Sequence, residues 1–469
     1  MTGRPPTIAI VGAGFSGSLL AVHLLRHLPP GGRIHLIERD QRFGRGVAYS
    51  TGNAGHLLNV RAGNMSAYAD RPGHFVEWLQ ALPEAQRAAF GASADAGCFA
   101  SRQLYGDYVQ GLIAQSLRDP EAAGRLNLVA DSVVAVEPGA EDVAITLGVG
   151  KRLAVDMAVL AVGNFPPAPP FAADPAFYDS ALYQGDPWAP SALADLAPTV
   201  PVLLIGTGLT MVDTVLSLRD RGHVGPIHAV SRRGLLPHAH AAAPPLPPYA
   251  LDALPVPVAA LLRHLRAEAR RAEAAGGDWR SVVDALRPAT QDLWRRLPLA
   301  ERRRFLRHLR PWWDTHRHRL APQVGARIAA AQAEGQLRIL AARVQGYRYG
   351  GHGVLVDVRP RGAAAAQTLS VARVVNCSGP ACDYRRVADP LIRQLLDSGT
   401  IVPDALELGI EVSDDGAVID RAGREGRRLY AIGPVTRSAF WEITAVPDIR
   451  RQAERLAAHL AERCAGLPG

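Results

Sequence analysis

One short stretch near the N-terminus constrains the fold most strongly. Residues 7–25 read TIAIVGAGFSGSLLAVHLL, in which an apolar strand leads through a glycine turn into an apolar helix. A second strand, RIHLIERD (33–40), follows that helix. This order describes a βαβ unit, whose two parallel strands are joined by a right-handed crossover helix. The pattern predicts an α/β fold built on a parallel sheet.

The glycine turn has the G-x-G-x-x-G spacing of a dinucleotide-binding fingerprint. The first glycine makes the tight turn, the second lets a pyrophosphate approach the backbone, and the third lets the helix pack on the strand. The N-terminus of the helix supplies amide donors and a positive dipole for the phosphates. Glu38 follows Gly17 by 21 residues, where a carboxylate binds ribose hydroxyls. The sequence therefore predicts a dinucleotide site at Gly12, Gly14, Ser16, Gly17 and Glu38.

A second unit of the same design begins at PVLLIGTGLTMVDTVLSL (201–218). It keeps Gly206 and Gly208 and has Met211 at the third position, so we expect a wider approach of helix and strand and an intact phosphate cradle. The next strand ends in Ser231-Arg232-Arg233 and lacks a carboxylate. A hydroxyl and two guanidiniums attract the 2′-phosphate that a carboxylate would repel. The second turn is therefore predicted to bind NADPH, with a structural relic as the alternative.

Position along the chain indicates FAD for the first turn. An N-terminal fingerprint combined with a distant LYAIGP segment (429–434) is typical of flavoproteins with two dinucleotide-binding domains, where the C-terminal strand completes the flavin domain. Gly433 is then expected to approach the flavin nucleotide, although Pro434 replaces the usual Asp. Gly163, at the end of the strand MAVLAVG, is a further candidate contact.

The predicted fold class is α/β, with two Rossmann-like dinucleotide-binding domains for FAD and NADPH and a largely helical insertion. Proline-rich stretches at 164–170 and 238–258 interrupt regular structure and suggest crossings between domains. Residues 259–335 have helical spacing, and strands are expected at 336–350, 353–360 and 371–376. The expected domains are FAD-binding (1–165 and 376–469), NADPH-binding (166–240 and 326–375) and the insertion (241–325).

Charge is concentrated in one segment. Residues 261–320 contain 15 Arg, no Lys and seven Asp or Glu, so this segment accounts for the whole formal net charge of +8. An arginine-rich face can bind nucleic acid, but no recognised nucleic-acid module is present. An anionic substrate or a cofactor phosphate is the favoured partner.

Other features exclude several classes of protein. Four cysteines are too few for a disulfide scaffold in a chain of 469 residues, and the pair Cys377 and Cys382 lies too far downstream to match the redox pair of flavin disulfide reductases. The sequence has no apolar run of the roughly 20 residues that a membrane span needs. The first strand begins within seven residues, so we expect no signal peptide and a cytoplasmic location.

The chain resembles the bacterial FAD-NAD(P)-binding proteins along nearly its whole length. The resemblance is carried by GAGFSG, HLLNVRAGNMSAYADRPGHFVEWL, LAVGNFPP, IGTGLTMVD, VSRRGLLP, LRHLRPWWDTHRHRLAP and FWEITAVPDIR. Relatives include nitrosuccinate-forming L-aspartate N-monooxygenases and, more distantly, flavin-containing monooxygenases and ornithine N-hydroxylases. The F-x-G-x-x-x-H signature of many monooxygenases is missing, since FYDSALYQGDPW (177–188) has no histidine.

The resemblance implies further site residues. Asn59, Met65 and Ser66 are expected to line the flavin ring, and Trp441 and Thr444 to precede a final helix whose N-terminus faces it, with simple packing as the alternative for Trp441. An anionic substrate is expected at the polar aromatic block that holds Trp313, His316, Arg317 and Arg319. His316 and His318 point apart on a helix, so no metal site is expected there.

Three functions remain open at this stage. The leading hypothesis is an FAD-dependent, NADPH-consuming monooxygenase, in which O2 adds to reduced flavin at C4a and the hydroperoxide oxidises a small amine or amino acid at nitrogen. The second is an NADPH-dependent oxidoreductase that passes electrons to a quinone or a protein. The third is a non-catalytic nucleotide-binding protein. A small-molecule substrate and O2 are the expected partners, and the oligomeric state is left open.

Overall fold

The computed structural model describes residues 4–170, 175–351 and 353–466. The chain forms two compact units. The first contains the described residues up to Ala54, Val60–Phe165 and those from Cys382 onward, and the second contains Gly55–Asn59 and Pro166–Ala381. The expected α/β fold with two Rossmann-like units is confirmed.

A six-stranded sheet forms the centre of the first unit, in the order β15-β16-β7-β1-β2-β3. Its strands are β1 (Thr7–Val11), β2 (Arg33–Ile37), β3 (Leu126–Val129), β7 (Met157–Leu160), β15 (Ala417–Ile419) and β16 (Glu425–Ala431). All but β15 pair in parallel, and β7 is buried at every position. Because β16 pairs with β7, the expected return of the C-terminal strand is confirmed.

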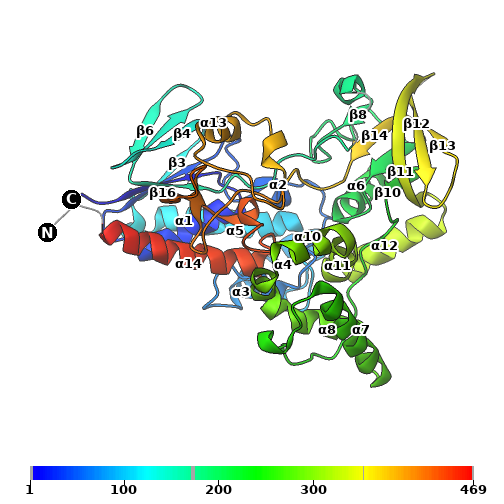
Figure 1. Ribbon diagram of the computed structural model, residues 1–469, viewed down its shortest axis with the longest axis horizontal. Coiled ribbons are helices and arrows are strands. Elements are labelled where there is room, and N and C mark those ends of the chain that lie inside the picture. The colour runs from blue at the N-terminus through cyan, green and yellow to red at the C-terminus, as the bar shows by residue number, and fades with distance from the viewer. Residues whose placement is uncertain (1–3, 171–174, 352, 467–469) are drawn as a thin grey trace. The chain divides into compact units, whose positions relative to one another are not determined.

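Helices cover this sheet. α1 (Phe15–His27) follows the first glycine turn, and α14 (Val446–Ala465) packs along it (Figure 1). A separate antiparallel sheet consists of β4 (Val133–Pro138), β5 (Val143–Leu147) and β6 (Arg152–Val155). The other α-helices of the unit are α2 (Gly46–Tyr49), α3 (His74–Ala81), α4 (Glu84–Ala89), α5 (Arg102–Arg118) and α13 (Pro390–Ser398).

The second unit has a seven-stranded sheet in the order β13-β12-β11-β10-β9-β14-β8. Its strands are β8 (Tyr183–Gln184), β9 (Val202–Ile205), β10 (Ile227–Ser231), β11 (Leu337–Gly350), β12 (Gly353–Pro360), β13 (Gln367–Val371) and β14 (Arg373–Asn376). The long β11 pairs in parallel with β10 through Ala341 and then antiparallel with β12. α6 (Leu209–Asp220) follows the second glycine turn.

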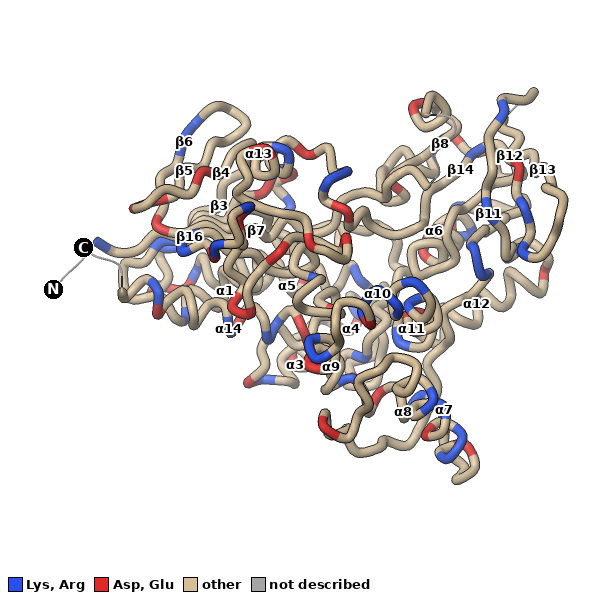
Figure 2. The backbone as a smooth tube through the Cα atoms, viewed as in Figure 1, with Lys and Arg blue, Asp and Glu red and all other residues tan. Residues whose placement is uncertain are grey.

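The arginine-rich segment is helical, as its spacing predicts. It contains α7 (Val258–Ala274), α8 (Trp279–Leu286), α9 (Thr290–Arg296), α10 (Leu299–His308) and α11 (Arg310–Arg317), and α12 (Pro322–Ala333) leads back into the sheet. Leu254, Leu286, Ala289 and Leu293 form its small apolar core. Basic residues recur along α7 to α11 in Figure 2.

Two boundaries differ from those predicted. Residues 376–381 run from the last residue of β14 onward and belong to the second unit. Gly55–Asn59 also belongs to the second unit, although it was predicted to be part of the FAD domain. The latter segment is held by hydrogen bonds that link distant residues. His56 Nε2 lies 2.9 Å from the carbonyl oxygen of Asp213, and His240 Nε2 lies 3.0 Å from that of Asn59.

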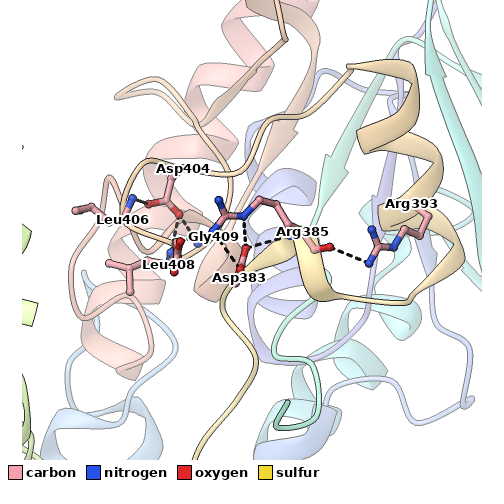
Figure 3. A network of polar contacts seen from close by, with 8 residues as sticks. Asp383, Arg385, Arg393, Asp404, Leu406, Leu408 and Gly409 are labelled. Atoms are coloured by element: carbon pink, nitrogen blue, oxygen red, sulfur yellow. Dashed lines mark hydrogen bonds and ion pairs between the residues drawn. The ribbon is translucent and has the colours of Figure 1, made fainter. Parts of the chain in front are cut away.

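A buried carboxylate organises the loop before β15. Asp404 accepts hydrogen bonds from the backbone N–H groups of Leu406 (2.7 Å), Leu408 (2.7 Å) and Gly409 (2.6 Å), as Figure 3 shows. Burial raises the pKa of Asp404, whereas these three donors favour the ionised form. This network fixes the path that leads the chain back into the first sheet. No helix among the described residues is long and apolar enough to span a bilayer.

Candidate functional site: two glycine turns at parallel sheets

The first glycine turn has no room for side chains at two of its three glycines. Gly12 has φ +104°, and a Cβ atom on it would lie 2.4 Å from the carbonyl oxygen of Ala161. A Cβ atom on Gly17 would lie 1.9 Å from the carbonyl oxygen of Gly12. Gly14 is different, because its nearest neighbour would be the Cα atom of Gly46 at 3.5 Å. The turn therefore packs against the residue after β7 at Gly12 and brings α1 onto the turn backbone at Gly17, whereas Gly14 stays accessible.

Glu38 is tied to this turn. It directly follows β2, and its Oε2 accepts a 2.8 Å hydrogen bond from the N–H of Ala13. The segment that follows crosses the turn, since Gly44 donates to the carbonyl oxygen of Ala13 at 2.8 Å. This segment was not predicted to lie at the turn, although the two glycines in FGRG (43–46) are a signal for a close approach of backbones.

Gly433 lies against the first turn of α1. It has φ +80°, and a Cβ atom there would be 2.4 Å from Ser16 Oγ. Its N–H donates to Gln452 Oε1 at 2.9 Å, and Gln452 in turn donates to Thr436 Oγ1 at 3.0 Å. The structure thus brings Ser16 and Gly433 together. Gly163 has φ +70°, with open space where a Cβ atom would be.

The residues expected to line a flavin ring have separate surroundings. Met65 and Ser66 are buried, and the Ser66 hydroxyl is 2.7 Å from the carbonyl oxygen of Arg71, to which it donates. Asn59 belongs to the second unit. Trp441 is buried beneath the Arg437 guanidinium, whose Cζ lies 4.9 Å from a ring centroid of Trp441, whereas Thr444 is exposed just before α14.

The second turn repeats the first position of the fingerprint. Gly206 has φ +110°, and a Cβ atom on it would lie 2.4 Å from the carbonyl oxygen of Cys377. A Cβ atom on Gly208 would meet nothing within 4 Å. Met211 takes the third position and is fully buried. The turn therefore accommodates a side chain where the first turn requires glycine.

The end of β10 carries hydroxyl and guanidinium groups. Thr207 Oγ1 donates to the carbonyl oxygen of Leu235 at 2.6 Å, so the 2.9 Å contact between Thr207 and Ser231 uses the Ser231 proton. Ser231 Oγ also accepts from the N–H of Gly234 at 3.0 Å. Arg233 makes a long, 3.4 Å hydrogen bond to the carbonyl oxygen of His308. Arg232 is exposed, and the described residues offer it no ion-pair partner.

The four predicted substrate residues fall into different settings. Trp313 packs against the apolar core of the insertion. His316 lies beside His238 and Trp279, with ring centroids 4.6 and 4.7 Å away. Arg317 and Arg319 are both buried, and Arg319 pairs with Asp284. No local pattern marks His238 or Trp279 as neighbours of His316.

Comparison with known proteins gives a family for the first part of the chain. Residues 9–165 match the family model described as FAD-NAD(P)-binding. These residues form an FAD-NAD(P)-binding domain. No curated protein matches the chain significantly.

The whole chain has the fold of solved N-hydroxylating enzymes. It is similar to the reduced form of ornithine hydroxylase from Pseudomonas aeruginosa, with 16% identity, a TM-score of 0.66 and coverage of 98% of this chain and 100% of that one. The ornithine N-hydroxylase of Kutzneria sp. 744 has 16% identity and a TM-score of 0.67, and the match covers 99% of this chain and 100% of that one. L-lysine 6-monooxygenase from Pseudomonas syringae has 17% identity and a TM-score of 0.65, and the match covers 98% of this chain and 99% of that one.

The FAD-NAD(P)-binding domain fits a dinucleotide on its own geometry. The N-cap residue of α1 is Gly14, which provides no side-chain cap, so the first amide N–H groups of the helix remain available for an anion. Glu38 follows the second strand, as ribose recognition requires. In the second unit, α6 begins in the same way at Gly208, again without a side-chain cap. Both turns are therefore suited to a pyrophosphate.

Cys377 and Cys382 are not joined by a disulfide in this structure. Cys377 Sγ lies 3.4 Å from Thr214 Oγ1, and burial raises the pKa of the Cys377 thiol to about 12. A thiol that stays protonated is a poor nucleophile. Within the described residues, no group of three or more His, Cys, Asp or Glu side chains is arranged to hold a metal ion.

Proposed function

We propose that this protein is an FAD-dependent, NADPH-consuming monooxygenase that hydroxylates a small amine or amino acid at nitrogen. The proposal is supported by the fold, which the chain shares over nearly its full length with enzymes named for ornithine and lysine hydroxylation. One of those structures, the ornithine N-hydroxylase of Kutzneria sp. 744, is a complex with reduced FAD, NADP+ and L-ornithine.

One observation carries the proposal: the chain has two uncapped glycine turns whose neighbouring strands end in groups of opposite charge. Glu38 follows β2, while β10 ends at Ser231 and is followed by Arg232. A carboxylate accepts hydrogen bonds from ribose hydroxyls, and a guanidinium binds a 2′-phosphate. The first turn is accordingly proposed for FAD and the second for NADPH.

Each turn has a defined task in this proposal. The amide groups at the start of α1 bind the FAD pyrophosphate, and Glu38 holds the ribose while Ala13 fixes its carboxylate. In the second unit the start of α6 binds the NADPH pyrophosphate. Arg232 is proposed to bind the 2′-phosphate, because the Ser231 proton is already engaged with Thr207. When bound, FAD supplies the two-electron chemistry that links NADPH oxidation to O2.

The final helix is proposed to act through its dipole. α14 begins at Val446 after Ala445, which provides no side-chain cap, so its N-terminal amides carry partial positive charge. Such an N-terminus stabilises negative charge on a reduced ring system. Trp441 and Thr444 immediately precede it, and Met65 and Ser66 are proposed to shape the same surroundings. Gly163 and Gly433 remain proposed flavin contacts.

The test is reduction of the purified flavoprotein without oxygen. We expect the flavin absorbance to bleach with NADPH much faster than with NADH. On admission of air with a matching amine present, hydroxylamine should form in proportion to the NADPH consumed. Reoxidation that yields only hydrogen peroxide with every amine offered, together with fast turnover of a quinone under nitrogen, would identify an oxidoreductase instead. Tightly bound flavin that NADPH cannot reduce would identify a non-catalytic nucleotide-binding protein.

A further inference from the structure

A cluster of rings and guanidiniums lies within the second unit, between the proline-rich connection and α11. Residues 238–240 run alongside the end of the helical segment: the N–H of His238 donates to the carbonyl oxygen of Thr315 at 3.1 Å, and the N–H of Leu320 donates to that of His238 at 2.8 Å. These backbone contacts place the His238 side chain beside α11.

Three aromatic rings meet at this position. The His238 centroid is 4.6 Å from that of His316 and 5.1 Å from that of Trp279, and Trp279 and His316 are 4.7 Å apart. His316 Nδ1 lies 2.8 Å from the carbonyl oxygen of Trp312 and must donate to it, which leaves Nε2 to gain a proton. Within the described part of the chain, no hydrogen bond involves the ring nitrogens of His238, and its side chain is exposed.

Two guanidiniums are fixed next to the rings. Arg280 lies over Trp279, with its Cζ 4.5 Å from the centroid, and its Nε and Nη2 donate to the carbonyl oxygen of Ala239 at 3.0 and 2.9 Å. Arg319 is 3% exposed and pairs with Asp284. Its Nε is buried without a hydrogen-bond partner.

The field at His238 is positive. Partial desolvation by the surrounding side chains lowers the pKa of His238, and the neighbouring His316, Arg280 and Arg319 lower it further. Asp278 and Asp284 are each paired with one of these guanidiniums. Asp314, two residues before His316 on α11, lies 3.5 Å from the Arg310 guanidinium. The cluster therefore combines unused donor capacity with excess positive potential, which is the chemistry of an anion site.

We propose that the His238–His316–Arg319 cluster binds an oxyanion, either the carboxylate of a small molecule or a phosphate group. Trp279 and Arg280 form its wall. An oxyanion has only acceptors to offer, and protonated imidazoles present only donors, so the two are complementary. Binding should be coupled to proton uptake by His238, whose pKa partial desolvation and the neighbouring positive charges lower. The inference is independent of the proposed oxygenation, because it concerns binding alone.

The experiment is a titration of the full-length protein with sodium acetate and with inorganic phosphate, followed by NMR of labelled histidine rings. We expect His238 and His316 resonances to move together, and the affinity to be higher at pH 5.5, where protonated imidazoles present only donors, than at pH 8. A response to acetate alone indicates a carboxylate ligand. A response to phosphate, and to NADP+ more than to NAD+, indicates a phosphate ligand.

Matched variants make the test decisive. His238→Asn and His316→Asn should each abolish the response, while His308→Asn, an exposed histidine on α10, should leave it unchanged. Folding of each variant is checked by circular dichroism and by retention of flavin. If neither anion shifts the two histidines, or if both variants respond like the unaltered protein, the proposed site does not exist.

Discussion

The two glycine turns are alike at their first glycine and differ at their third position. Gly12 and Gly206 both have φ above +100°, and a Cβ atom on either would lie 2.4 Å from a carbonyl oxygen that follows the neighbouring strand. The third position is Gly17 in one turn and Met211 in the other. Backbone geometry at the first position is thus common to both turns, whereas helix packing and the groups after the second strand distinguish them.

The largest effect is expected for Gly17→Ala. The added Cβ would lie 1.9 Å from the backbone oxygen of Gly12, which cannot move without opening the turn. We expect unfolding free energy to fall by more than about 3 kcal/mol and bound flavin to be lost. Thermal denaturation and flavin content measure this. Gly14→Ala is the control, since it should fold normally; a wild-type melting temperature for Gly17→Ala would contradict the packing described.

The next effect is a loss of stability in acid that is expected from a buried histidine on α1 and not from α6. His23 on α1 is buried, and burial lowers its pKa to about 4, from an ordinary value of 6.5. The folded state therefore keeps His23 neutral while the unfolded chain takes up a proton. Stability from this residue is present above pH 6.5 and is lost as the pH falls toward 4, by up to about 3 kcal/mol.

His23→Leu should flatten this part of the pH profile, as measured by urea denaturation between pH 4 and 7.5. α6, the corresponding helix of the second unit, has no histidine. Hydrogen exchange should accordingly show acid-induced opening in α1 before α6. Equal slopes for the variant and the unaltered protein would exclude His23 as the source.

A smaller effect is expected for coenzyme selection. Arg232→Ala removes the exposed guanidinium after β10 and should reduce the preference for NADPH over NADH at least about tenfold, or 1.4 kcal/mol. The ratio of kcat/KM for flavin reduction by the two coenzymes measures the change. Arg338→Ala, an exposed arginine on the adjacent β11, is the matched control. An unchanged ratio would remove Arg232 from phosphate recognition.

The smallest effect on stability is expected for Gly208→Ala. The added methyl group would meet nothing within 4 Å, so unfolding free energy should change by no more than about 0.5 kcal/mol. KM for NADPH should nevertheless rise severalfold, because the methyl group would occupy the position of the pyrophosphate. A variant with lower stability but normal KM would show that the open space serves the fold and not the coenzyme.

The sequence predicted those parts of the fold that local patterns determine. Strand, glycine turn and helix follow one another directly in both βαβ units, and helical spacing identified the arginine-rich segment. β13 was missed because AAQTLS lacks a strong apolar alternation. Gly55–Asn59 was assigned to the wrong unit because its anchors, Asp213 and His240, lie far away in the sequence.

In the candidate site, too, local sequence patterns predicted some features and long-range contacts determine others. The proposed roles of Gly12, Gly14 and Glu38 follow from their spacing, whereas the spacing does not show that the Ser231 proton is engaged with Thr207. The meeting of His238 with His316 depends on backbone hydrogen bonds of His238 with Thr315 and Leu320, which lie 77 and 82 positions further along the chain. Such long-range hydrogen bonds are set by the tertiary fold and leave no periodic signal.

The pairing of β16 with β7 has a consequence for folding during translation. The ribosome releases the second unit, which ends at Ala381, before it has made β16 or α14. During synthesis, one edge of β7 and the side of α1 that contacts α14 therefore stay uncovered until β16 and α14 have been made. The middle of the chain can complete its fold first, whereas β7 and α1 reach their final environment only after β16 and α14 have been made.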